Sequence, residues 1–201
     1  LLKTLEEPPE YAVIILIAEN TSSLLPTVLS RCQLIKIPRL SANHITSIVE
    51  KKTGISQKEA LVFAKLSEGL PGKALELAGS DEYRQLREEV LNLIENLASA
   101  NFLEAMGYTR FFEERRDRVD DTLDLLQLWL RDMLVYRENG DATLIINMDR
   151  ISTIKSLSKN FTTKRIRDMI EKVEETKKKL RAYANFQMTI ENMLVSIRGS
   201  D

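Results

Sequence analysis

The chain has 201 residues, of which 43% are hydrophobic and 29% are charged, and its 29 basic and 30 acidic side chains leave a formal net charge of -1. This composition fits a globular protein with a sizeable core, built as one large domain or as two or three small ones. It argues against a protein that grips nucleic acid mainly through its own surface, because such proteins show a basic excess. One cysteine excludes internal disulfides and a cysteine-rich zinc site. No apolar run approaches the ~20 residues of a membrane span.

The first forty residues combine the end of a helix with a single apolar segment. Residues 1–7 are typical of the last turns of an amphipathic helix, stopped by Pro8-Pro9, and there is no initiating Met. Residues 12–18 are apolar on both faces, which predicts a buried central strand of a parallel sheet. No second run of this kind follows. We therefore expect a fragment that lacks most of an N-terminal α/β domain.

An arginine follows this predicted strand in a distinctive position. After the polar turn at 19–23 comes a short segment bounded by Pro26, and it leads to Ser30-Arg31-Cys32. This order places a guanidinium at the edge of a protein. Because arginine presents a planar fork of donors and keeps its charge, such an edge suits a phosphate on a neighbouring molecule.

After Pro38 the sequence is predicted to be helical throughout. Ser41 can cap a helix that ends before Gly54, and a Ser56–Glu59 capping box opens a second helix. A third, short helix begins at Pro71. Three short helices make a small bundle, which is expected to pack on its neighbours.

From Ser80 onward the periodicity predicts a larger helical bundle. The stretch 121–137 is apolar nearly all round, so we expect its own bundle or partner subunits to bury it from several sides. The other helical stretches are 83–97, 102–116, 149–159, 163–183 and 186–198. The predicted fold class is therefore mainly α, with a strand remnant in front.

Three elements in this order resemble the clamp-loader branch of the AAA+ ATPases. They are Leu-Leu-Lys-Thr-Leu-Glu-Glu-Pro-Pro at 1–9, the apolar run, and Ser30-Arg31-Cys32. The resemblance covers 1–40 most specifically and continues through 41–80. In the helical remainder, residues 128–134 and 190–194 are similar to the collar domain of that family.

The resemblance implies a domain organisation and a task. Residues 1–40 would be the C-terminal remnant of the AAA+ ATPase domain, 41–80 the three-helix lid, and 81–201 the helical collar. Members of the family join through their collars into a ring, open a sliding clamp with ATP, and close it around primer–template DNA. The chain would then act with other clamp-loader subunits, the clamp and DNA, in the bacterial cytoplasm.

The same resemblance marks three candidate site residues. Arg31 matches an arginine finger that reaches the γ-phosphate of ATP on the adjacent subunit; the alternative is a surface arginine that caps a helix C-terminus. Asn20 lies near the sensor-1 position, although it is equally a turn former that bonds its own backbone. Lys73 falls where motor subunits carry the sensor-2 arginine, and this departure favours a subunit without ATP turnover.

Other side chains of possible chemical interest have simpler interpretations. Cys32 is expected to be a small packed hydrophobe. His44 has no second ligand in sequence reach, so no metal site is predicted. The lysines at 177–179 have glutamates within one helical turn of them, which indicates ion pairs on a solvated face rather than a DNA-binding patch.

The resemblance therefore implies an accessory subunit of a DNA-directed DNA polymerase (nucleotidyltransferase) holoenzyme that is not catalytic alone. The sequence contains no Gly-x-x-x-x-Gly-Lys-[Ser/Thr] phosphate loop, so the expected cofactor is ATP held by the adjacent subunit and none bound by this chain. Two alternatives stay open. One is a motor ATPase subunit of the same loader, and the other is a helical scaffold without a role in ATP chemistry.

Overall fold

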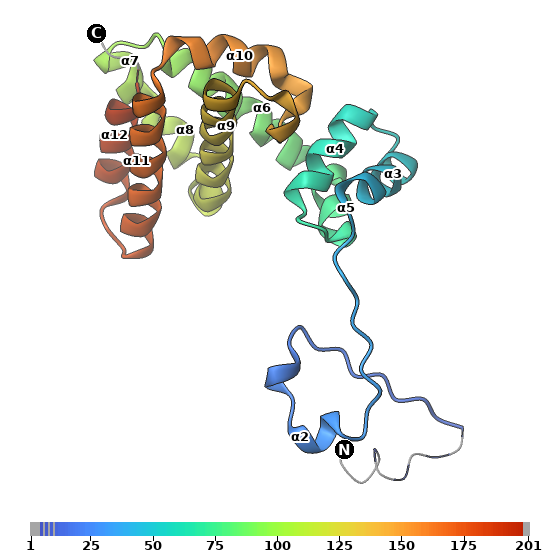
Figure 1. Ribbon diagram of the computed structural model, residues 1–201. Coiled ribbons are helices and arrows are strands. Elements are labelled where there is room, and N and C mark those ends of the chain that lie inside the picture. The colour runs from blue at the N-terminus through green and yellow to red at the C-terminus, as the bar shows by residue number, and fades with distance from the viewer. Residues whose placement is uncertain (1–4, 6, 8, 10, 199–201) are drawn as a thin grey trace. The chain divides into compact units, whose positions relative to one another are not determined.

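The computed structural model describes residues 5, 7, 9 and 11–198, and every regular element among them is a helix (Figure 1). The chain forms two compact units, Leu1–Pro38 and Arg39–Asp201, which are described separately. None of the helices within the described residues is both long and apolar enough to cross a membrane.

The first unit corrects the expectation of a strand at 12–18. Residues 12–18 form no strand, and the side chains of Val13, Ile15 and Ile17 are 88%, 78% and 95% exposed. A strand is stable only when its N–H and C=O groups pair with a neighbouring strand, and the described residues offer none. The regular elements of this unit are the 3₁₀ turn η1 (Thr21–Ser23) and the short helix α2 (Pro26–Leu29).

The second unit begins with a bundle of three helices, α3 (Ala42–Thr53), α4 (Gln57–Leu66) and α5 (Pro71–Gly79). We call residues 42–79 the first bundle. The Ser41 side chain caps α3, and Gly54 ends it in the left-handed region at a φ of 72°. These boundaries confirm the prediction. The buried core of this bundle comprises Ile45, Val49, Ala60, Phe63, Ala64, Ala74 and Ala78.

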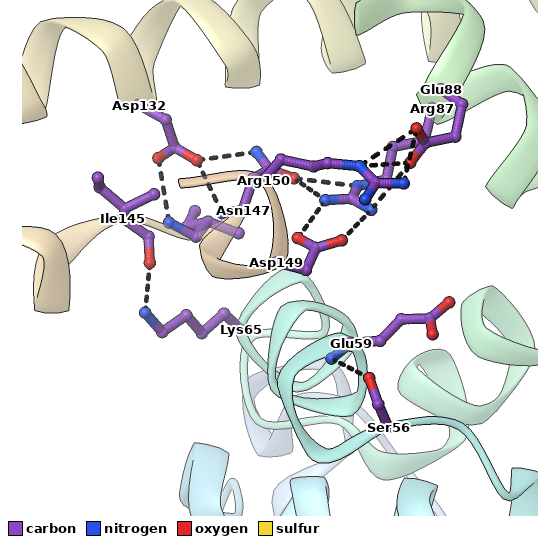
Figure 2. Close-up of polar contacts among 11 residues, drawn as sticks. Ser56, Glu59, Lys65, Arg87, Glu88, Asp132, Ile145, Asn147, Asp149 and Arg150 are labelled. Carbon is purple, nitrogen blue, oxygen red and sulfur yellow. Dashed lines mark hydrogen bonds and ion pairs between the residues drawn. The ribbon is translucent and has the colours of Figure 1, made fainter. Parts of the chain in front are cut away.

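The predicted capping box at the start of α4 is half formed. The Ser56 hydroxyl accepts the amide of Glu59, whereas the Glu59 carboxylate points away from Ser56 (Figure 2). A complete box occurs instead at the start of helix α7 (Phe102–Gly107), where Asn101 and Glu104 exchange side-chain and backbone hydrogen bonds.

Residues 81–197 form the second bundle. The expected single helix over 102–116 is wrong, because the chain breaks at Tyr108 into α7 and the short α8; Gly107 weakens the helix there. The further elements are α6 (Asp81–Leu97), α8 (Thr109–Glu113), η2 (Arg116–Arg118), α9 (Val119–Asn139), η3 (Ala142–Leu144), η4 (Met148–Arg150), α10 (Ile151–Asn160), α11 (Thr163–Arg181) and α12 (Phe186–Ile197).

Helix α9 is the central element of the second bundle. It packs against α6, α10 and α11, which surround it in Figure 1. Leu123, Leu126 and Trp129 are at most 1% exposed. The expectation that this stretch is buried from several sides is confirmed, and the helices of its own bundle do the burying.

Candidate functional site

Arg31 lies just past the C-terminal end of α2. Pro26 occupies the first helical position, where its fixed φ and missing N–H suit a helix start, and Ser30 caps the other end. The exposed Arg31 side chain donates from Nη1 to the Thr27 carbonyl oxygen at 2.9 Å and to Ser30 Oγ at 3.3 Å. A cation beside the last carbonyls of a helix is favourable, so this contact matches the helix-capping alternative.

The bonds from Arg31 to Thr27 and Ser30 are local. Thr27 and Ser30 lie within one turn of Arg31 and are exposed to solvent. A hydrogen bond at such a surface contributes roughly 1 kcal/mol net, because water can replace either partner. These two local bonds are therefore weak. The role as a finger remains a prediction.

Asn20 forms the local turn that its residue type favours. Its Oδ1 accepts the amide of Ser22 at 2.9 Å, and its carbonyl oxygen accepts the Ser23 hydroxyl at 2.7 Å. The side chain thus caps η1. These contacts agree with the turn-former interpretation, and the sensor-1 role stays a prediction.

Lys73 belongs to the second unit, whereas Arg31 and Asn20 belong to the first. It is an exposed residue in the first turn of α5. The residue before this helix, Leu70, offers no side-chain hydrogen bond to the helix start. A lysine beside such a terminus favours an anion, but the described contacts do not test the sensor-2 role.

The lysine cluster of α11 has the predicted ion pairs. Lys178 lies 3.8 Å from Glu174, Lys179 pairs with Glu175, and Lys177 pairs with Asp124 of α9. Hydrogen bonds from Lys179 and then Lys172 lower the pKa of Glu175 to about 2. The exposed Lys178 and Lys179 thus confirm the predicted pairs along the helix, whereas the Lys177 side chain is only 11% exposed and pairs with a neighbouring helix.

The remaining candidates do not form a reactive centre. His44 Nδ1 shares a hydrogen bond with the hydroxyl of its own N-cap, Ser41, at 3.0 Å. Cys32 is a half-buried free cysteine, which agrees with its interpretation as a packed side chain. Over the described part of the chain, no group of three or more His, Cys, Asp or Glu residues could hold a metal ion.

Sequence reasoning missed a buried polar cluster formed by Arg87, Asp132, Asn147 and Asp149 (Figure 2). Arg87 on α6 is 3% exposed, and its guanidinium binds both carboxylate oxygens of Asp149 at 2.7 and 2.9 Å. Its Nε and Nη2 also donate to Asn147 Oδ1 at 3.0 and 2.7 Å. The guanidinium carbon lies 5.1 Å from the centre of the Trp129 ring.

Asp132 organises the other half of this cluster. Its fully buried carboxylate accepts the amides of Ile146 and Asn147 at 3.1 and 2.8 Å, and the Asn147 side-chain amide at 2.8 Å. These bonds fix the non-helical segment between α9 and α10. The position of Asp132 within a nearly all-apolar helix could have indicated this cluster from the sequence, because a buried carboxylate requires hydrogen-bonding partners.

The buried polar cluster is better suited to a structural role than to ligand binding. The buried polar cluster is internally paired, and this favours a structural role. A surface hollow of about 170 Å³ lies beside α6, smaller than the roughly 300 Å³ at which ligand pockets begin. Its charges also pair, since Arg115 bonds Glu89 at 2.8 Å and Arg118 bonds Glu82 at 3.2 Å.

Comparison with known families matches both ends of the chain. Residues 1–41 match the family described as "DNA polymerase III, delta subunit". Residues 81–199 match the family described as "DNA polymerase III, delta subunit, C terminal". The two matches follow one another in chain order, and the second covers more than half of the residues.

Individual relatives give the same picture. The chain is 30% identical over 203 residues to DNA polymerase III subunit delta' of Bacillus subtilis, which covers 98% of this chain and 60% of that protein. It is 26% identical over 200 residues to the Escherichia coli delta' subunit, covering 98% and 58%. It is also 24% identical over 193 residues to the B. subtilis subunit tau, covering 85% and 34%. The chain thus spans about three-fifths of the length of the delta' relatives.

Proposed function

The chain belongs to the DNA polymerase III delta-subunit family, and from this premise we propose that it serves as a delta'-type subunit of the bacterial clamp loader. The observation that carries the proposal is the 30% identity to the B. subtilis delta' subunit over 98% of this chain, and the family matches at 1–41 and 81–199 agree with it. The delta' relatives, which align with 98% of this chain, support it.

In this role the protein helps to load the sliding clamp onto primed DNA in the bacterial cytoplasm. The second bundle acts as the collar that joins neighbouring loader subunits, and the first bundle acts as the lid. The loader as a whole contacts the clamp and the primer–template DNA. The match to subunit tau supports partners within the same assembly.

Arg31 is proposed to act on ATP held by the adjacent subunit. Its exposed position just past the end of α2 supports this. An arginine supplied across an interface stabilises charge on the transferring phosphoryl group and contributes roughly 10³–10⁵ in rate in studied systems. Asn20 and Lys73 are secondary candidates for contacts around the nucleotide.

Reconstitution tests the proposed function directly. The full-length protein is mixed with the partner loader subunits, the clamp and primed DNA, and assembly and clamp loading are measured. We expect a stable complex that loads the clamp, and loading should fall sharply with Arg31→Lys, since a point charge lacks the guanidinium fork. Arg110→Ala is the control, because the Arg110 side chain is 82% exposed and pairs only locally with Glu114, the residue that follows α8. Failure to assemble would contradict the proposal.

A motor subunit of the tau/gamma type is the second candidate, and the 24% identity to tau favours it. The two candidates differ in whether the full-length protein binds and hydrolyses ATP itself. Equilibrium ATP binding and turnover by the isolated full-length protein distinguish them. A delta'-type subunit without ATP turnover is expected to be inactive alone, whereas a motor subunit turns ATP over.

A further inference from the structure

The two bundles of the second unit have separate hydrophobic cores. The core of the first bundle is built from α3, α4 and α5, and that of the second bundle from α6 to α12. Each core closes on itself, so a change in the angle between the bundles need not open either one. The contacts between the bundles therefore decide whether they form one rigid body.

One of these contacts has the form of a pivot. Helix α5 ends at Gly79 and α6 begins at Asp81, so Ser80 alone joins the two helices. Tyr83, in the first turn of α6, packs against both cores, and its ring centre lies 6.4 Å from that of Phe63. A single linking residue beside one shared aromatic ring permits rotation with little loss of packing.

The second contact, away from the pivot, is polar (Figure 2). Lys65 on α4 extends its ammonium group to two backbone carbonyl oxygens of the segment between α9 and α10, that of Thr143 at 3.0 Å and that of Ile145. The buried polar cluster holds this receiving segment, because Asp132 binds the amides of Ile146 and Asn147. The carbonyl groups are thus preorganised on the second bundle, and the donor belongs to the first.

The chemistry of this contact makes it reversible. The ammonium group gives up water for two neutral carbonyls, and burial, the larger effect, lowers the pKa of Lys65 despite the nearby Asp132. On release, water can satisfy both the ammonium and the carbonyls, so opening leaves no buried group unpaired. One fully buried apolar residue, Val62, lies a turn before Lys65 on α4. Helix α4 also packs on η4 at this junction, and Lys65 supplies its charged hydrogen-bond donor.

We propose that Lys65 is a latch that holds the first bundle against the second, and that its release lets the first bundle rotate about Ser80 and Tyr83. The segment Thr143–Ile145 receives the latch, and Asp132 keeps that segment in place when the latch is open. This latch couples the angle of the first bundle to the second, and the proposal does not depend on the proposed function.

A distance measurement between the bundles tests the latch. The full-length protein carries azido amino acids in place of the exposed Lys51 on α3 and Lys178 on α11, and the attached labels report the distribution of distances. Lys65→Met should raise the share of a second, displaced distance about tenfold, as expected for loss of a charged hydrogen bond. Lys65→Arg should restore the single distribution, and Lys58→Met is the matched control on the same helix.

Hydrogen exchange separates a latch from a general loss of stability. Amides in both cores, at 45–49 and 90–94, should keep their protection in Lys65→Met and in Lys65→Gln. An unchanged distance distribution in both variants would overturn the proposal. Loss of core protection in step with the change in distance would overturn it as well, because Lys65 would then support folding rather than latch two folded bundles.

Discussion

At Arg87 a buried guanidinium is satisfied from three sides, by the Asp149 carboxylate, the Asn147 side-chain oxygen and the face of Trp129. Two of these partners lie about sixty residues away in the sequence. The periodicity of α6 places position 87 on the face of Tyr83, Val90 and Ile94, although the residue itself is charged. The sequence does not show which side chains satisfy it there. The pairing of Arg87 with Asp149 can be recognised only in the folded structure, where α6 and η4 lie together.

Removing this guanidinium should be costly. Arg87→Ala leaves the Asp149 carboxylate, which is 15% exposed, without its bidentate partner. We expect a loss of about 3–5 kcal/mol in the free energy of unfolding, measured by denaturant titration. Arg84→Ala, which removes an i,i+3 pair with the exposed Asp81, should cost at most about 1 kcal/mol. Equal losses in the two variants would show that the buried polar cluster is not stabilising.

Tyr83 predicts a dependence of stability on alkaline pH. Burial, the largest cause, raises the pKa of its phenol from 10.0 to about 12. The fold therefore favours the neutral phenol, so this contribution is present below the unfolded pKa and is lost as pH rises through the folded pKa. Tyr83→Phe should flatten the decline in unfolding free energy between pH 10 and pH 12 relative to the parent protein. An identical decline in both proteins would exclude Tyr83 as its source.

The helix starts of the first bundle could be predicted because their signals are local. Ser41 and Ser56 cap α3 and α4 as their positions indicate, and Pro71 opens α5. The break at Tyr108 was missed, since the apolar spacing continues through it. The capping box at Ser56 was also only partly predictable. Ser56 and Glu59 are residue types that can form both hydrogen bonds of the box, but the second bond is absent because the Glu59 side chain is oriented away from Ser56.

The turn between α4 and α5 gives a matched pair of glycine substitutions. Gly69 has a φ of 93°, and an added Cβ would lie 2.5 Å from Arg39 Cβ and 3.1 Å from the Leu40 carbonyl oxygen. Gly69→Ala should therefore destabilise the protein by about 2 kcal/mol or more. Gly72 on α5 has open space, so Gly72→Ala should be neutral or stabilise by up to about 1 kcal/mol. Thermal unfolding of both variants checks the contrast, which equal effects would contradict.

For the whole molecule, the apolar run at 12–18 shows the limit of pattern reasoning. Its composition predicts a buried strand, yet Val13 and Ile17 are exposed because the described residues provide no strand to pair with them. The helical class was predictable, since long periodic stretches carry their own signal. The arrangement of two cores around a polar junction was not, because it depends on Lys65 meeting carbonyls some eighty residues away.

The sequence is also limited in what it can predict about the proposed nucleotide site. Sequence places Arg31 after a Pro-bounded turn, and the structure places it exposed at the end of α2. Whether it meets a phosphate depends on a second protein, which no pattern in this chain encodes. Asn20 and Lys73 lie in different units, so their relation to a nucleotide is likewise a property of the assembly.

The most direct test of the central claim separates ATP binding from ATP hydrolysis in the reconstituted loader. Arg31→Ala is assembled with wild-type partner subunits, clamp and primed DNA, and ATP affinity and the single-turnover hydrolysis rate are measured. We predict near-normal ATP binding and hydrolysis slowed by roughly 10³-fold or more at the nucleotide site facing this subunit. Hydrolysis at the wild-type rate at that site in a fully assembled loader would contradict the account.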